Sequence, residues 1–213
     1  MLKLYDYFRS SAAFRVRIAL NLKGLSYESI PIHLLNNGGE QFTKEYQAIN
    51  PQSLVPALQV DGKIITQSLA IIEYLDETHP GTPLLPADPY TKALVRSFAL
   101  AITADIHPLN NLRVLRYLSN ELKCSEDQKS KWYQHWMAKG LSALEQFLTQ
   151  HKMSQEYCFG NTPTLADICL IPQLYNAKRF ACDLNAYPTL VAIDTRCQQL
   201  KAFKDACPKE TVA

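Results

Sequence analysis

The sequence has no long hydrophobic run and no excess of charge of one sign. No stretch approaches the roughly 20 apolar residues that a membrane-spanning helix needs, and the N-terminus has no apolar segment typical of a secretory signal. The 22 lysines and arginines nearly balance the 20 aspartates and glutamates, which argues against nucleic acid or a membrane as the main partner. We expect a cytoplasmic protein, for which a small anionic ligand stays possible.

The sequence also lacks paired cysteines. Its six cysteines contain no CxxC pair, and all lie beyond residue 123: Cys124, Cys158, Cys169, Cys182, Cys197 and Cys207. Disulfide frameworks and zinc sites are recognised by close, regular cysteine spacing. We therefore expect reduced thiols, mostly packed in the interior, and no metal site.

The first eighty residues alternate strand and helix patterns. We predict strands over residues 2–5, 27–32, 55–60 and 63–65, and helices over 11–24, 41–48 and 67–79. Asp61-Gly62 joins the last two strands with the residues of a tight hairpin turn. This order predicts a small mixed sheet with helices packed on it.

A proline-rich segment separates this half from the rest of the chain. PGTPLLPADP, residues 80–89, holds four of the twelve prolines, a density that no helix interior accepts. Beyond it the apolar spacing is helical throughout, Pro108 is expected to kink a helix, and Thr164-Leu165-Ala166-Asp167 has the form of a capping box. The sequence thus predicts domains over residues 1–80 and 89–213, joined by a linker over 81–88.

Arg9-Ser10-Ser11 lies where the first strand turns into the first helix. The start of a helix offers unpaired N–H groups and a partial positive charge, which stabilise an anion and lower the pKa of a nearby thiol. The alternative is that one serine only caps the helix. Arg17 lies two residues beyond Arg15 and points away from it, so we expect it to be solvated or to bridge the domains.

Two further features belong to the same expected edge of the sheet. Val55-Pro56 precedes a strand, where a cis proline would turn the backbone of Val55 outward to pair with an extended peptide. A trans proline in an ordinary turn is the alternative. Gln67-Ser68 begins the next helix, where it could bind a carboxylate or serve only as a cap.

The order of these features resembles the cytosolic glutathione transferases. SSAAFRVRIALNLKG, NPQSLVPAL, QSLAIIEYL and DIHPLNNLRVL are similar to the zeta class, and the resemblance continues through GNTPTLADICLIPQ, NAKRF and YPTL. It implies an α/β plus all-α fold: a thioredoxin-like N-terminal domain with a four-stranded mixed sheet, and an all-helical C-terminal domain. It also implies a homodimer and glutathione as cofactor.

The resemblance assigns roles to individual residues. Val55 would pair with the cysteinyl backbone of glutathione, Gln67 and Ser68 would hold the γ-glutamyl carboxylate, and Ser10 and Ser11 would face the sulfur. The remaining cofactor contacts that it implies are Arg15, Gln41, His107, Asn111 and Arg113. Arg179, within NAKRF, would bind a substrate carboxylate, and His107 replaces a glutamine of some zeta members.

The sequence departs from the familiar SSC pattern of the zeta class, because Ala12 stands in the place of the cysteine. A mechanism that needs a protein thiol at this point is therefore disfavoured. The helix dipole and the serine hydroxyls would have to activate a borrowed sulfur. The same departure disfavours a glutaredoxin-like thiol transfer.

The implied activity is the cis–trans isomerisation of maleylacetoacetate to fumarylacetoacetate in the catabolism of tyrosine and phenylalanine. Three alternatives stay open. The substrate could be maleylpyruvate, the enzyme could be a general transferase or haloacid dehalogenase, or the chain could be a binding module without catalysis. The joint presence of the serines, Val55-Pro56 and Gln67-Ser68 argues against the last.

Overall fold

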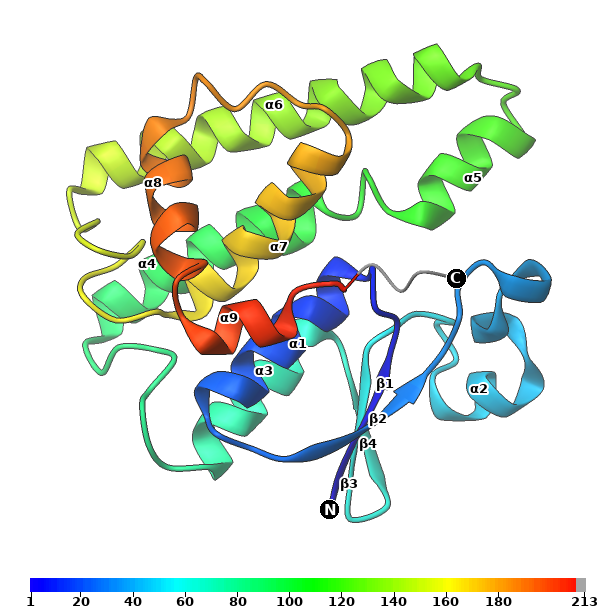
Figure 1. Cartoon of the computed structure of the whole chain (residues 1–213), viewed down its shortest axis with the longest axis horizontal. Coiled ribbons are helices and arrows are strands. Elements are labelled where there is room, and N and C mark those ends of the chain that lie inside the picture. The colour runs from blue at the N-terminus through cyan, green and yellow to red at the C-terminus, as the bar shows by residue number, and fades with distance from the viewer. Residues whose placement is uncertain (210–213) are drawn as a thin grey trace. The chain divides into compact units, whose positions relative to one another are not determined.

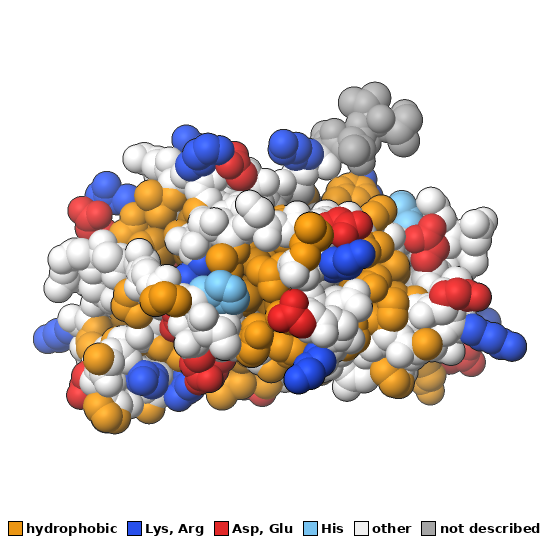
Figure 2. All heavy atoms as spheres, turned by 90° about the horizontal axis from the view of Figure 1, so that it is seen from below, with side chains coloured by type: hydrophobic (Ala, Val, Ile, Leu, Met, Phe, Trp, Pro, Cys, Tyr) orange, Lys and Arg blue, Asp and Glu red, His pale blue; other side chains and the backbone are white. Residues whose placement is uncertain are grey.

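The computed structural model describes residues 1–209, which divide into two compact units. The first unit is Met1–Leu84 together with the segment that begins at Leu200, and the second is Leu85–Gln199 (Figure 1). No helix among residues 1–209 is long and apolar enough to cross a membrane. On the face in Figure 2, side chains of both charges are interspersed with apolar ones, in keeping with the balanced composition.

The first unit contains a four-stranded sheet in the order β2-β1-β3-β4. The strands are β1 (Leu2–Asp6), β2 (Tyr27–Pro31), β3 (Ala57–Val60) and β4 (Lys63–Thr66). The helices are α1 (Ser11–Leu22), α2 (Lys44–Ile49), α3 (Ser68–Thr78) and α9 (Lys201–Ala206), with short 3-10 turns η1 (Asn36–Gly38) and η2 (Glu40–Phe42). Only β1 and β2 pair in parallel, so the expected mixed sheet is confirmed.

The register of the sheet brings four connections to one edge. Tyr5, near the end of β1, pairs with Ala57 at the start of β3, and Ala57 pairs with Thr66 at the end of β4. Tyr5 also pairs with Ile30, near the end of β2. Four connections therefore lie side by side at this edge: the turn before α1, the segment after β2, the segment before β3 and the start of α3. The sequence predicted this for all but the segment after β2.

The last helix packs in the first unit rather than with the other C-terminal helices. α9 lies against α1 (Figure 1), where Phe203 and Ala206 are buried and Asn21 Nδ2 donates to the Ala202 carbonyl at 2.9 Å. The sequence had placed residues 89–213 in one helical domain, and the structure divides the chain differently from Leu200 onward. Periodicity cannot reveal this, because it does not say against which helix an apolar face packs.

The second unit is helical. Its α-helices are α4 (Pro89–Leu100), α5 (Leu112–Asn120), α6 (Glu126–His151), α7 (Leu165–Arg179) and α8 (Pro188–Cys197). The Asp167 carboxylate accepts from the Thr164 and Cys158 N–H groups, both at 2.8 Å, so the capping aspartate at the start of α7 is confirmed. Pro188 occupies the first turn of α8, where a missing N–H costs nothing.

The chain breaks at Pro108 instead of continuing as a kinked helix. α4 runs into a π-helical segment, η3 (Ala101–Ile106), in which the His107 N–H donates to the Ile102 carbonyl at 2.8 Å. A turn follows, and α5 begins only at Leu112. A wide turn and a residue without an N–H together end the helical ladder. His107 and Arg113 therefore lie on different elements, not on one helix.

Gly140 marks a close contact between α6 and η3. A Cβ atom on Gly140 would lie 2.2 Å from Ile106 Cδ1 and 2.3 Å from Ile106 Cγ1. Such distances are far inside van der Waals contact, so the side chain of Ile106 must shift if any larger residue replaces this glycine. The absence of a side chain at Gly140 therefore sets how closely these two elements pack.

We expect Gly140→Ala to lower the free energy of unfolding in the wild-type background, because overpacking costs about 1–3 kcal/mol and exceeds the gain of about 1 kcal/mol in helix propensity. In an Ile106→Ala background the clash is gone, so Gly140→Ala should raise the free energy of unfolding. Urea unfolding of the four proteins of this double-mutant cycle measures the coupling. An equal effect of Gly140→Ala in both backgrounds would contradict the packing described above.

Candidate functional site

Ser10 caps α1. Its backbone is extended, its Oγ accepts from the Ala13 N–H at 3.2 Å, and its own N–H donates to the Tyr7 carbonyl at 2.8 Å. A hydroxyl that accepts one hydrogen bond can still donate another. Ser11 is the first helical residue and is buried. The structure thus assigns the N-cap to Ser10, whereas the sequence could not decide which of the two serines caps the helix.

The Val55-Pro56 peptide bond is cis, so the structure decides between the cis and trans alternatives that the sequence left open. Val55 precedes the β3 ladder, whose pairing begins at Ala57. The preceding carbonyl of Leu54 accepts from the Tyr46 hydroxyl and from Asn50 Nδ2, both at 2.7 Å. These two hydrogen bonds fix the segment that delivers Val55 to the edge of the sheet.

Gln67 and Ser68 begin α3. Gln67 adopts φ 70°, a conformation that side chains rarely take, and its Nε2 donates to Gln52 Oε1 at 2.8 Å. Ser68, the first helical residue, is only 6% exposed. The first N–H groups of a helix have no partner within it, so the start of α3 can receive an acidic group. Backbone strain held at such a position is typical of binding sites.

Arg15 joins the starts of the two helices. Its side chain is 1% exposed, and Nη1 donates to Ser68 Oγ at 3.3 Å. Its observed contact is therefore with a site residue, and the direct cofactor contact implied by the resemblance stays a prediction.

Gln41 offers a buried hydrogen-bond acceptor. The residue is 4% exposed, its Nε2 donates to the Leu34 carbonyl at 3.5 Å, and its Oε1 has no donor among residues 1–209. A Cβ on Gly39 would lie 2.6 Å from Oε1, and the backbone of Gly39 has φ 117°, so a larger residue here would be strained and would displace the amide of Gln41. Leu34 packs on the apolar cluster of Tyr7, Tyr46 and Val55, and this places Gln41 at the same edge of the sheet.

The candidate residues of the second unit lie at the turn that follows η3. His107 Nε2 is 3.4 Å from Asn111 Nδ2, and Asn111 Oδ1 accepts from the Arg113 N–H at 3.0 Å. Asn111 therefore caps α5, which positions it beside His107. The side chain of Arg113 is exposed. His107 lies before the break at Pro108 and Asn111 lies after it. The two side chains nevertheless remain in contact.

Arg179 is the last residue of α7, and its side chain is exposed. Its Nη1 donates to Asn176 Oδ1 at 3.5 Å, and its Cζ lies 5.6 Å from the centre of the Phe180 ring. Phe180 stacks on Tyr133 with ring centres 3.7 Å apart. The guanidinium therefore rests on an aromatic support while its polar edge stays accessible to a carboxylate.

Three of the six thiols are poorly suited to nucleophilic catalysis. Burial raises the pKa of Cys158, Cys182 and Cys197, so these thiols stay protonated at neutral pH, and the thiolate is the reactive form. The residues at the start of α1 are serine and alanine. Among residues 1–209 no group of three or more His, Cys, Asp or Glu side chains could hold a metal ion.

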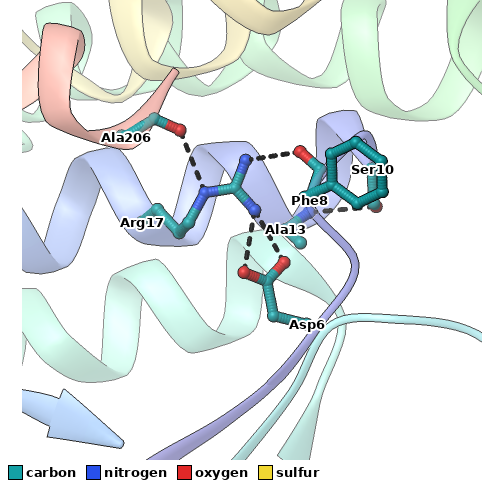
Figure 3. A network of polar contacts seen from close by, with 6 residues as sticks. All are labelled: Asp6, Phe8, Ser10, Ala13, Arg17 and Ala206. Atoms are coloured by element: carbon teal, nitrogen blue, oxygen red, sulfur yellow. Dashed lines mark hydrogen bonds and ion pairs between the residues drawn. The ribbon is translucent and has the colours of Figure 1, made fainter. Parts of the chain in front are cut away.

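An ion pair that the sequence did not predict lies beside the start of α1 (Figure 3). Arg17 Nη1 contacts both carboxylate oxygens of Asp6 at 2.6 and 2.9 Å, and both side chains are buried. Burial raises the pKa of Asp6, while Arg17 acts against this rise. Of the two roles expected for Arg17, the solvated one is wrong. Its Nε donates to Ala206, in the segment that the sequence had placed in the helical domain and that the structure places in the first unit. The signal in the sequence that could have revealed this ion pair is Asp6, an acidic residue at the end of β1 that needs a cationic partner if it is buried.

The two halves of the chain match known families. Residues 4–83 match the glutathione S-transferase N-terminal domain, and residues 110–206 match the C-terminal domain. A relative from Vibrio cholerae named "Probable maleylacetoacetate isomerase" is 50% identical, with 97% of this chain and 95% of the relative covered.

Solved structures agree with this family. The holo structure of a maleylpyruvate isomerase, described as a bacterial glutathione S-transferase in the zeta class, superposes with a TM-score of 0.95 at 42% identity, covering 99% of this chain and 98% of that one. A maleylacetoacetate isomerase from Methylobacterium extorquens AM1, solved with malonate and glutathione, superposes with a TM-score of 0.93 at 40% identity. This match covers 97% of this chain and 96% of that one. The chain therefore belongs to the glutathione S-transferase family, within its zeta class.

Proposed function

We propose that the protein is a glutathione-dependent cis–trans isomerase that converts maleylacetoacetate to fumarylacetoacetate in tyrosine and phenylalanine catabolism. The observation that carries the proposal is the meeting of Ser10, Val55, Gln67 and Ser68 at one edge of the sheet. The name of the relative that is 50% identical supports the choice of reaction.

The first unit fits glutathione in its chemistry. Glutathione is an extended peptide that carries N–H donors, carboxylates and a thiol. Gln41 Oε1, buried and without a donor among residues 1–209, can accept from a peptide N–H. The N–H groups at the start of α3, with Gln67 and Ser68, can bind the γ-glutamyl carboxylate, and Val55 precedes the strand ladder where backbone pairing is available.

When bound, glutathione supplies a thiolate that adds to the cis double bond, lets the bond rotate and is then eliminated, so that it is regenerated. The chain's own contribution is to keep the sulfur ionised. The N–H groups and the dipole of α1 favour a negative charge at Ser10, and the hydroxyl of Ser10 can donate to it. We assign Ser11 a smaller contribution than Ser10. Because Ala12 has no thiol, these groups alone would activate the sulfur of glutathione.

A dicarboxylate substrate requires cationic anchors. We assign this role to Arg179, whose planar guanidinium binds a carboxylate at two points and whose position on Phe180 leaves that edge exposed. The malonate in the structure of the relative from Methylobacterium extorquens supports a dicarboxylate ligand. Arg15, His107, Asn111 and Arg113 are proposed as further cofactor contacts, on the resemblance alone.

The assembly and the location follow from the same resemblance. We propose a homodimer, because the resemblance implies a two-fold interface between the N-terminal domain of one chain and the helical domain of the other, as is common in symmetric dimers. We also propose a cytoplasmic location, because the cysteines are expected to be reduced. Sedimentation velocity at micromolar concentration tests the dimer, and a single monomeric species would contradict it.

The runner-up substrate is maleylpyruvate, which the similarity to a maleylpyruvate isomerase at a TM-score of 0.95 favours as an alternative. We expect turnover of maleylacetoacetate only in the presence of glutathione, with a higher kcat/KM than for maleylpyruvate. Steady-state assays of both compounds, each with and without glutathione, decide between them. A higher kcat/KM for maleylpyruvate would reverse the assignment, and turnover without glutathione would refute the proposed function.

Ser10→Ala should raise the thiol pKa of bound glutathione by about one unit, equivalent to about 1.4 kcal/mol lost from the thiolate form. Ser11→Ala should raise it less. Titration of thiolate absorbance in the ultraviolet measures both. Ser125→Ala is the matched control, because Ser125 also caps a helix, with its Oγ 3.2 Å from the Gln128 N–H. An unchanged thiol pKa in both Ser10 and Ser11 variants would mean that the serines only start the helix.

Arg179→Ala should weaken binding of the diacid about ten- to a hundredfold and spare glutathione, because a charge-assisted carboxylate contact is lost. Substrate KM and glutathione affinity are the two measurements. Arg196→Ala is the control, since Arg196 is another half-exposed arginine, 3.9 Å from Glu156. Loss of glutathione affinity with an unchanged substrate KM would show that Arg179 is misassigned.

A further inference from the structure

Arg17 uses its whole guanidinium within the first unit (Figure 3). Besides the two contacts of Nη1 with Asp6, Nη2 donates to the Phe8 carbonyl at 3.0 Å and Nε donates to the Ala206 carbonyl at 3.0 Å. The residue is 8% exposed. One side chain thus joins the end of β1, the turn that follows it and the end of α9.

These contacts bind α1 to its own entry turn. Asp6 ends β1 and Ser10 caps α1, so the intervening residues decide where Ser10 lies relative to the sheet. Arg17, two turns into the helix, holds the chain at Asp6 and again at Phe8. Within the turn, the Ser10 N–H is held by the Tyr7 carbonyl.

A guanidinium is required for this arrangement. Its three nitrogens donate in fixed, different directions, whereas lysine carries its donors on a single nitrogen. Without Arg17, the Asp6 carboxylate would stay buried beside two carbonyls that have lost this donor. Such a group is expensive to leave unpaired, so the turn has a strong reason to rearrange.

We propose that Arg17 is a positioning residue that holds Ser10 in place for thiolate activation, by fixing the Asp6 carboxylate and the Phe8 carbonyl, and that α9 completes the site through Ala206. This inference rests on the proposed function in one respect, namely that glutathione is the ligand at Ser10. The competing explanation is a buried ion pair that only stabilises the first unit.

Two variants separate positioning from stability. Arg17→Lys keeps the charge and loses the directions of donation, and the double variant Asp6→Asn with Arg17→Gln removes both buried charges. Asn21→Ala is the matched control: Asn21 also lies on α1 and also donates to α9, at the Ala202 carbonyl. All are compared under conditions in which each protein is fully folded.

The first measurement needs no ligand. The Ala13 N–H is bound by Ser10 Oγ, so its hydrogen exchange, followed by NMR, reports whether the cap is in place. We expect about fivefold faster exchange at Ala13 in both Arg17 variants, the size of effect that the loss of a cap brings, and no change in Asn21→Ala.

The second measurement is the thiol pKa of bound glutathione, from its ultraviolet absorbance. We expect a rise of about half a unit or more in both Arg17 variants, with the Asn21→Ala value equal to wild type. If the Arg17 variants lose stability but keep the Ala13 exchange rate and the thiol pKa, the pair is only structural and the proposal is wrong. Failure of the wild type to bind glutathione would instead refute the proposed function and leave the Ala13 result standing.

Discussion

The first N–H groups of a helix have no carbonyl partner within it, and in the first unit both α1 and α3 begin at the same edge of the sheet. This places the positive dipole ends of two helices at one edge of the sheet. Four of the candidate residues lie at these connections: Ser10 at one helix start, Gln67 and Ser68 at the other, and Val55 in the segment that leads into β3. An anionic, extended ligand is the natural complement.

Two buried arginines of α1 form hydrogen bonds with the connections at this edge. A buried guanidinium is costly unless its donors are used, so each marks a place where polar groups converge. Arg15 reaches the start of α3 through Ser68, and Arg17 reaches the turn before α1 through Phe8. Because Arg15 and Arg17 are two residues apart on α1, one guanidinium contacts the start of α3 and the other contacts the turn before α1. The stability of the first unit and the geometry of its edge depend on the same side chains.

Much of this could be predicted from the sequence, because the informative signals are local. Asp61-Gly62 predicted a hairpin, Thr164 and Asp167 predicted a helix start, and Val-Pro before a strand allowed the cis bond that is present. What failed depends on partners distant in sequence. Arg17 is buried partly through its hydrogen bond to Ala206, which is 189 residues away. Likewise, α9 packs against α1, which lies at the other end of the sequence. At Pro108 the sequence predicted a kink, because it did not reveal the π-helical segment Ala101–Ile106 that precedes the proline and with it ends the helix.

The protein's own chemistry explains why its sulfur must come from outside. Burial keeps the pKa of Cys158, Cys182 and Cys197 raised, and Ala12 occupies the position where the zeta pattern has a cysteine. A thiol fixed at the start of α1 would itself receive the stabilisation that the helix offers to a thiolate and would compete with a bound ligand for it. With serine and alanine there, the positive end of the α1 dipole and the Ser10 hydroxyl can stabilise the thiolate of a diffusible ligand. The opening RSSAAF is therefore consistent with a helix start arranged to activate a cofactor.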